Sequence, residues 1–191
     1  MTAPLDEFIT TPDARERFEV VVDAPPELVF AVAREFDMQS LPLVRAIFRL
    51  REIFTRSTRV RREPQGLLAE LTSLGWAVLR LEPDRLLIGG AACQPWRADV
   101  VFRPIPASEF RDFAAPGQVK IAWTIEVTPE RATTTRLATE TRAEATDPDA
   151  RRRFRRYWRW ARFGILPIRW LLLPAIGRKA DAEWRRRQAR T

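Results

Sequence analysis

The sequence predicts a single α+β domain in which a curved antiparallel sheet of about seven strands wraps around a long C-terminal helix. Three observations support this fold class: the length of 191 residues suits one domain, apolar residues alternate with polar ones over several segments, and apolar residues recur at helical spacing after residue 147. Apolar residues make up 46% of the chain, enough for a core. We divide the chain into a loose lead-in over 1–15, the domain over 16–175 and a basic tail over 176–191.

The first predicted elements are a strand and two short helices. Apolar and polar residues alternate over 16–23, which is the period of a half-buried strand. Pro25 and Pro26 end this strand, and proline is tolerated in the first turn of a helix, which we expect to reach Asp37. An apolar stripe at spacings of four and three predicts a second helix over 41–54.

Six more strands are predicted between Gly75 and Thr146, and they span 76–82, 85–92, 97–103, 108–114, 119–127 and 132–146. The last two form the clearest hairpin. We expect Trp123 to face Leu137 on the buried side, and Lys120 to face Glu140 on the outer side, where opposite charges favour the pairing. A slip of one residue would turn the Trp123 face to solvent.

The last predicted element is a helix that begins after Asp147. Asp147 can cap it, Pro148 suits its first position, and apolar residues recur at spacings of four and three while arginines occupy the other faces. A helix that reached Arg187 would be about 60 Å long. We expect Pro167 and Pro174 to bend or break it, so that the last third folds back or projects beyond the domain.

The residue inventory excludes several classes of active site. The chain contains no histidine, which excludes a Ser-His-Asp triad, a Cys-His pair and histidine-ligated zinc or iron. The lone cysteine, Cys93, excludes an internal disulfide and has no base to activate it. We therefore expect no metal, no cofactor and no identifiable catalytic residue, and favour a binding protein over an enzyme. Since the N-terminus lacks a secretory pattern, we expect a cytoplasmic protein.

The basic charge is concentrated at the C-terminal end. The net charge is +8, and residues 151–191 contain 14 Lys and Arg but 2 Asp and Glu. Within this region, 163–177 is apolar on nearly all sides, yet shorter than the roughly 20 residues that span a bilayer. Flanking arginines and tryptophans are typical of a helix that lies in an anionic membrane surface. The alternatives are packing on its own domain, a homodimer interface and phosphate contacts to nucleic acid, for which no base-reading motif is present. The residues expected to contact membrane or partner are Arg162, Phe163, Arg169, Trp170 and Leu171.

The chain resembles the START-like superfamily, which includes Bet v 1-like proteins and polyketide cyclase/dehydrase relatives. The resemblance rests on the opening strand followed by Ala24-Pro25-Pro26-Glu27-Leu28-Val29-Phe30, on the order of elements, and on a late strand over 133–146 that runs into Asp147-Pro148-Asp149. It covers roughly residues 16–175 and implies the helix-grip fold with a cavity between sheet and final helix. Members bind lipids, sterols, polyketides or hormones, and a minority catalyse cyclisation or dehydration. No universal catalytic motif exists to transfer.

The inward faces supply the candidate cavity wall. A closed hydrophobic core is the alternative for each of these residues, and a threonine there can instead bond nearby backbone. The hypotheses are a carrier of an apolar lipid or polyketide-like molecule at a membrane surface, a cyclase/dehydrase-type enzyme, and a protein-interaction module that uses the C-terminal segment. The expected lining residues are Phe30, Phe102, Ile121, Trp123, Leu137, Thr139, Thr141, Trp158, Ala161 and Ile165.

Overall fold

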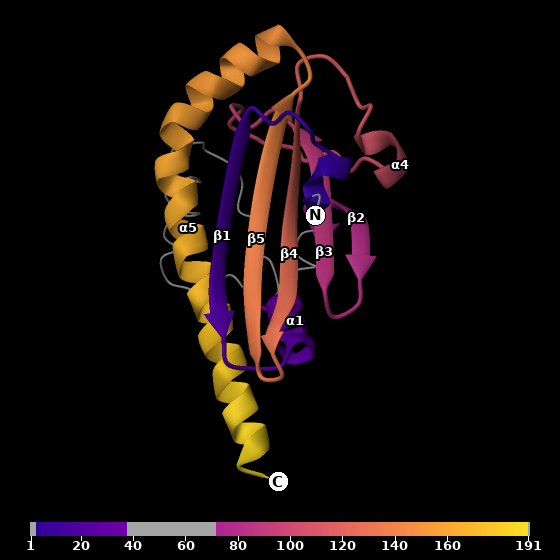
Figure 1. Cartoon of the computed structure of the whole chain (residues 1–191). Helices are drawn as coiled ribbons and strands as arrows, with labels where there is room; N and C mark the ends of the chain where they lie inside the picture. Colours follow the sequence, from indigo (N-terminus) through magenta and orange to yellow (C-terminus); the bar gives the residue numbers. More distant parts are fainter. Residues whose placement is uncertain (1–2, 38–71, 191) are drawn as a thin grey trace.

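The computed structural model describes residues 3–37 and 72–190, apart from the side chains of residues 164–166, 168 and 169. The predicted second helix over 41–54 lies outside the described residues. Figure 1 shows the elements, which are η1 Pro4–Glu7, β1 Ala14–Val22, α1 Pro26–Arg34, β2 Ala77–Glu82, β3 Leu86–Cys93, α4 Ala107–Phe110, β4 Val119–Arg131, β5 Thr134–Ala145 and α5 Pro148–Gln188.

The described strands form one open antiparallel sheet in the order β1-β5-β4-β3-β2 (Figure 1). The α+β class, the antiparallel sheet and the long C-terminal helix are confirmed. The expectation of about seven strands is wrong for the described residues, which form five. The predicted strand over 97–103 contributes one isolated bridge, Arg103 to Ala92, and the predicted strand over 108–114 begins inside helix α4. Pro104 and Pro106, which lie between these two segments, have no backbone N–H to donate, so no ladder continues from one segment into the other.

The β4–β5 hairpin is confirmed, but its register differs from the expected one by four residues. Trp123 lies opposite Thr141, and Lys120 lies opposite Glu144, with which it forms an ion pair of 3.2 Å. We expected the turn at residues 128–131, whereas β4 continues to Arg131 and β5 begins at Thr134. Because four is an even number, every side chain stays on its expected face of the sheet.

Both faces of the sheet are covered. On the Trp123 face, α1 and the C-terminal half of α5 pack against the strands in one apolar cluster that includes Phe30, Leu137 and Ile176. On the opposite face, the N-terminal segment and α4 form a second cluster, with Leu5, Phe8, Ile9 and Phe110 over Ile88 and Ala122. Residues 1–15 were expected to be loose, but Leu5, Phe8 and Ile9 are buried in this cluster. The face of Lys120 was expected to be outer, but Lys120 is buried and donates a hydrogen bond of 2.7 Å to the Arg111 carbonyl.

Two adjacent glycines let strand β3 fit between these layers. All eight of its residues are buried. A Cβ at Gly89 would overlap the Trp123 ring, and one at Gly90 would lie 2.6 Å from Phe110 Cε2 on the other face. Because Gly89 and Gly90 have no side chains, Trp123 and Phe110 can pack directly against opposite faces of the same strand.

Helix α5 is continuous over 41 residues. Asp147 caps it by accepting a hydrogen bond of 2.8 Å from the Ala150 backbone N–H. Pro167 and Pro174 lie inside the helix without ending it, and Figure 1 shows it curving along the β1 edge before its end extends past the sheet. The expected tail after residue 175 is thus helical, and Ile176 and Ala180 are buried. No helix in the described ranges has a stretch long and apolar enough to cross a membrane.

Candidate functional site

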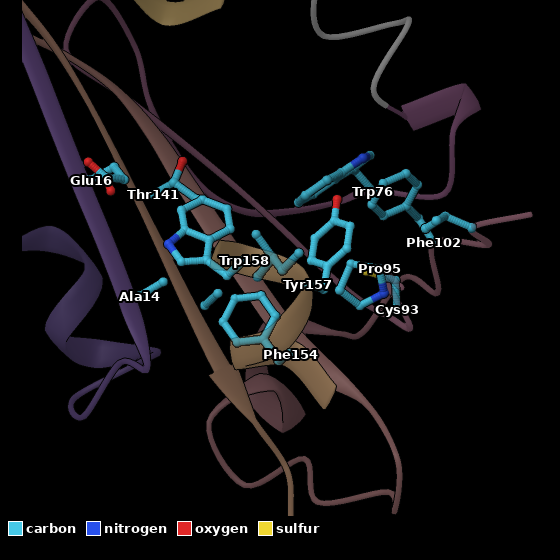
Figure 2. A pocket seen from close by; sticks show the side chains of 13 residues that line it. Ala14, Glu16, Trp76, Cys93, Pro95, Phe102, Thr141, Phe154, Tyr157 and Trp158 are labelled. Carbon is cyan, nitrogen blue, oxygen red and sulfur yellow. The ribbon is translucent and has the colours of Figure 1, made fainter. Parts of the chain in front are cut away.

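A cavity of about 190 Å³ lies between the sheet and the N-terminal turns of α5 (Figure 2). Its wall comes from three parts of the chain: strands β1, β5, β4 and β3 of the sheet, the start of α5, and the segments before β2 and after β3. The lining residues are Ala14, Glu16, Trp76, Cys93, Pro95, Val100, Phe102, Ile121, Thr141, Ala143, Phe154, Tyr157 and Trp158.

Small side chains on the sheet leave this space open. The strand register places Ala14, Ala143 and Ile121 in one row across β1, β5 and β4. In the next row, Glu16 lies opposite Thr141. The side chains of Ala14, Ala143 and Thr141 project little from the sheet, so a space remains between them and helix α5. These small residues form the floor of the cavity.

Aromatic rings form the remaining walls. Phe154, Tyr157 and Trp158 share one face of α5 because they are three and four residues apart, and the Phe154 and Trp158 rings stack with centroids 5.8 Å apart. Across the cavity, the rings of Trp76 and Phe102 lie 4.8 Å apart. In Figure 2, Tyr157 and Trp158 lie between Glu16 and Thr141 on one side and Trp76 and Phe102 on the other. The cavity is therefore an aromatic chamber closed on the sheet side.

Glu16 is the one charged residue among the described lining residues. It is partly buried, and its carboxylate forms no hydrogen bond or ion pair within the described part of the chain. Its neighbours on the same face of β1, Phe18 and Val20, pack against the apolar core. An acidic group without a partner among the described residues thus lies at the edge of an apolar space.

The acidic group on the opposite face of the sheet has several partners. Glu140 accepts a hydrogen bond of 2.6 Å from Arg142 Nε, and it forms an ion pair of 3.0 Å with Arg15. Arg142 also donates to Asp6 Oδ1 and to the Ile9 carbonyl, each at 2.6 Å. Burial alone raises the pKa of Glu140, but the hydrogen bonds from Arg142 and Arg15 outweigh it and hold that pKa below its usual value. This network ties the N-terminal segment to the sheet, and we assign it a structural role.

Four of the ten predicted lining residues border the cavity: Phe102, Ile121, Thr141 and Trp158. The others lie elsewhere. Phe30 and Leu137 are in the α1–α5 core, and Thr139 donates a 2.6 Å hydrogen bond to the Thr124 carbonyl. Trp123 borders a separate space of about 10 Å³ next to Gly89, and among the described residues its Nε1 has no hydrogen-bond partner. Ala161 is partly buried, and the side chain of Ile165 lies outside the described residues.

Sequence reasoning missed most of the remaining wall, above all Glu16, Trp76 and Tyr157. A signal for Glu16 was available, because it occupies an inward position of the period-two pattern in the first strand. Tyr157 lies beside a predicted inward residue, at helical spacing from Phe154. No local pattern marks Trp76, whose place depends on contact with Phe102.

The outward face of α5 carries exposed aromatic side chains. Phe163 is 65% exposed and Trp170 66%, and Trp160 and Leu171 are exposed with them. Their spacing places all four on one side of the helix. Arg162 is exposed, and its guanidinium lies 5.1 Å from the centroid of the Phe163 ring. The predicted contact residue Arg169 has its side chain outside the described residues. We call Trp160, Phe163, Trp170 and Leu171 the aromatic stripe.

The site has no metal-binding cluster within the described ranges, where no three His, Cys, Asp or Glu residues converge. Comparison with known proteins identifies no family: no family model matches the chain, and no curated protein matches it. Among solved structures, a hypothetical protein from Helicobacter pylori is similar, with a TM-score of 0.42 and 8% identity over 94% of this chain and 95% of that chain.

Proposed function

We propose that the protein binds a compact apolar molecule in the cavity between the sheet and α5. The observation that supports this proposal is the 190 Å³ space walled by aromatic rings. An engineered apolar cavity of about 150 Å³ takes up benzene, so this space suits one ring with a short substituent. Affinity would come from apolar area removed from water, at about 25 cal/mol per Å² before the costs of binding. The START-like, helix-grip organisation belongs to the same proposal, since a ligand between sheet and final helix is what that resemblance implies.

The proposal is tested with ethylbenzene as the probe. Trp76 and Trp158 line the cavity, so binding should change the tryptophan fluorescence saturably. Ala143→Leu adds methyl groups to the cavity floor and should abolish the change while the protein stays folded by circular dichroism. Val101→Leu is the matched control, because Val101 is 76% exposed and lies beside a lining residue without being one. Equal binding by the wild type and Ala143→Leu would contradict the proposal.

The natural occupant calls for a separate measurement. Mass spectrometry of small molecules released by denaturing the purified protein would identify a ligand that copurifies. A stoichiometric molecule with one ring or a short chain agrees with the cavity volume. A stoichiometric long-chain lipid would contradict it, since such a chain exceeds the space.

A second proposed function, contact with an anionic membrane surface, is supported by the aromatic stripe. Exposed tryptophan and phenylalanine between arginine clusters are typical of a helix that lies at the headgroup level. The residues before the stripe, such as Arg159, and after it, such as Arg178, are exposed and basic. Such a surface would place the carrier where an apolar ligand is collected or released.

Vesicle flotation tests this contact. The double variant Phe163→Ala/Trp170→Ala should lose binding to phosphatidylserine-containing vesicles at low salt. The control, Val21→Ala/Leu81→Ala, removes two exposed apolar side chains from the sheet and should bind like the wild type. Point substitutions are needed, because truncation after Arg162 would remove Leu173 and Ile176 from the core. If neutral and anionic vesicles float the wild type equally, or not at all, the membrane proposal fails.

A further inference from the structure

The cavity combines five aromatic side chains with one carboxylate. The rings belong to Trp76, Phe102, Phe154, Tyr157 and Trp158, and the carboxylate to Glu16. Among the described residues, no lysine or arginine lines the space, although the chain as a whole is strongly basic. The carboxylate of Glu16 distinguishes this cavity from a purely apolar pocket and bears on the charge of its ligand.

The position of Glu16 sets it apart from the other acidic residues of the sheet. Glu140, on the opposite face, is held by arginines. Glu19, on the same strand as Glu16, lies 3.8 Å from Arg17. Glu16 instead lines the cavity, partly withdrawn from water and without an ion pair in the described part of the chain. A carboxylate so placed is stabilised by any cation that enters the space.

The rings favour the same kind of ligand. The face of an aromatic ring carries partial negative charge and attracts a cation within about 6 Å of its centroid, most strongly for tryptophan. Trp158 lies on the Glu16 side of the cavity and Trp76 on the far side (Figure 2), so a cation near Glu16 would have the Trp158 ring as its tryptophan neighbour. Apolar burial, ring quadrupoles and the Glu16 charge then act on one small molecule together.

We propose that the ligand is a compact organic cation, an aromatic or alkyl ammonium, whose charged nitrogen lies near Glu16 and whose apolar part lies among the rings. This inference rests on the proposed binding function and specifies its ligand class. Of the arginines of α5 whose side chains are described, none lines the cavity, and the nearby Arg151 and Arg155 lie against Asp13. Glu16 is therefore the charged group that a ligand meets on the described cavity wall.

Three probes of nearly the same shape test the inference at about 0.15 M salt. Benzylamine, which is protonated at neutral pH, has the carbon framework of ethylbenzene with one methyl group replaced by ammonium, and phenylacetate carries a negative charge on a similar frame. We expect benzylamine to bind about tenfold more tightly than ethylbenzene and phenylacetate to bind least. Isothermal titration calorimetry and tryptophan fluorescence measure all three.

Two matched variants locate the effect. Glu16→Gln should weaken benzylamine binding about tenfold and leave ethylbenzene binding unchanged. Glu19→Gln removes the same charge from the same strand on the opposite face, and should change neither. Circular dichroism and the retained ethylbenzene signal report that Glu16→Gln is folded. The comparison of benzylamine, ethylbenzene and phenylacetate on the wild-type protein tests the charge preference without any variant.

The outcomes separate this inference from the function on which it rests. If ethylbenzene binds and benzylamine binds no better, or if phenylacetate binds best, the cation inference is overturned while the apolar cavity stands. If benzylamine is preferred but Glu16→Gln keeps that preference, the assignment of Glu16 is wrong. If none of the three probes binds, the proposed function itself fails.

Discussion

Replacing Arg142 with methionine is expected to destabilise the fold more than any single substitution of a surface arginine. Arg142 is 2% exposed and connects three groups from distant parts of the chain: Glu140, Asp6 and the Ile9 carbonyl. Methionine keeps much of the apolar volume but donates no hydrogen bond. The substitution therefore leaves the buried Glu140 carboxylate and the Ile9 carbonyl without their main donor.

The expected loss in the free energy of unfolding depends on which partners of Glu140 remain in the variant. Removing one partner of a buried ion pair costs about 3–5 kcal/mol. Arg15 and Arg17 still reach Glu140, at 3.0 and 3.4 Å, and both are partly exposed to solvent. We therefore expect the lower end of that range, about 3 kcal/mol, in the free energy of unfolding measured by urea denaturation. Arg136→Met, which breaks a surface pair with Glu130, is the matched control and should change stability far less.

The same network predicts an acid dependence. Since the pKa of Glu140 is lower in the folded protein than in the unfolded chain, its contribution to stability is present above the usual glutamate pKa of about 4.3. That contribution is lost as the pH falls through the folded value. Between pH 7 and acid, the wild type should therefore lose more stability than Arg142→Met. If Arg142→Met matches the wild type within about 1 kcal/mol at pH 7, the buried network does not have the structural role assigned to it.

Three further substitutions test other parts of the fold. Gly89→Ala should cost about 1–3 kcal/mol in urea denaturation, because its Cβ would overlap the Trp123 ring, and adding Trp123→Leu should recover part of the loss. Asp147→Ala should lower Tm at neutral pH, because it removes the α5 cap. The Ala150 and Gly117 backbone N–H groups hold the pKa of Asp147 below its usual value. The difference in Tm between the variant and the wild type should therefore shrink in acid, where Asp147 becomes protonated. Leu137→Ala should cost about 2–5 kcal/mol, and an unchanged denaturation midpoint would contradict its place in the core.

Features that depend on neighbouring residues were predictable from the sequence. The period-two pattern located the first strand, the predicted strands over 76–82 and 85–92 correspond to β2 and β3, and Asp147 located the start of α5. The faces of β4 and β5 were also predicted correctly. Each of these signals lies within a few residues of the chain, where backbone preference and apolar periodicity act directly.

Register, strand number and layer contacts were not predictable in the same way. Alternation along 119–145 is satisfied by any even shift of the pairing, so it could not distinguish the predicted register from the observed one. The Val-Val-Phe run at 100–102 has the composition of a strand, yet it is not one; the residue after it, Arg103, forms an isolated bridge with Ala92. The cover of the second face comes from Leu5, Phe8 and Ile9, a segment with no clear pattern of its own.

The sequence by itself determined the first strand, the two strands of the β4–β5 hairpin and the start of α5, and which side of each is apolar, because these features depend on local spacing. Only the tertiary structure decided where space remains between these elements. The cavity exists because Ala14, Thr141 and Ala143 form adjacent small positions beneath the first turns of α5. Arg142 and Asp6, which are 136 residues apart, likewise meet only after the sheet has formed. Contacts between distant residues have no counterpart in local periodicity, and they give Glu16 its place at the cavity wall.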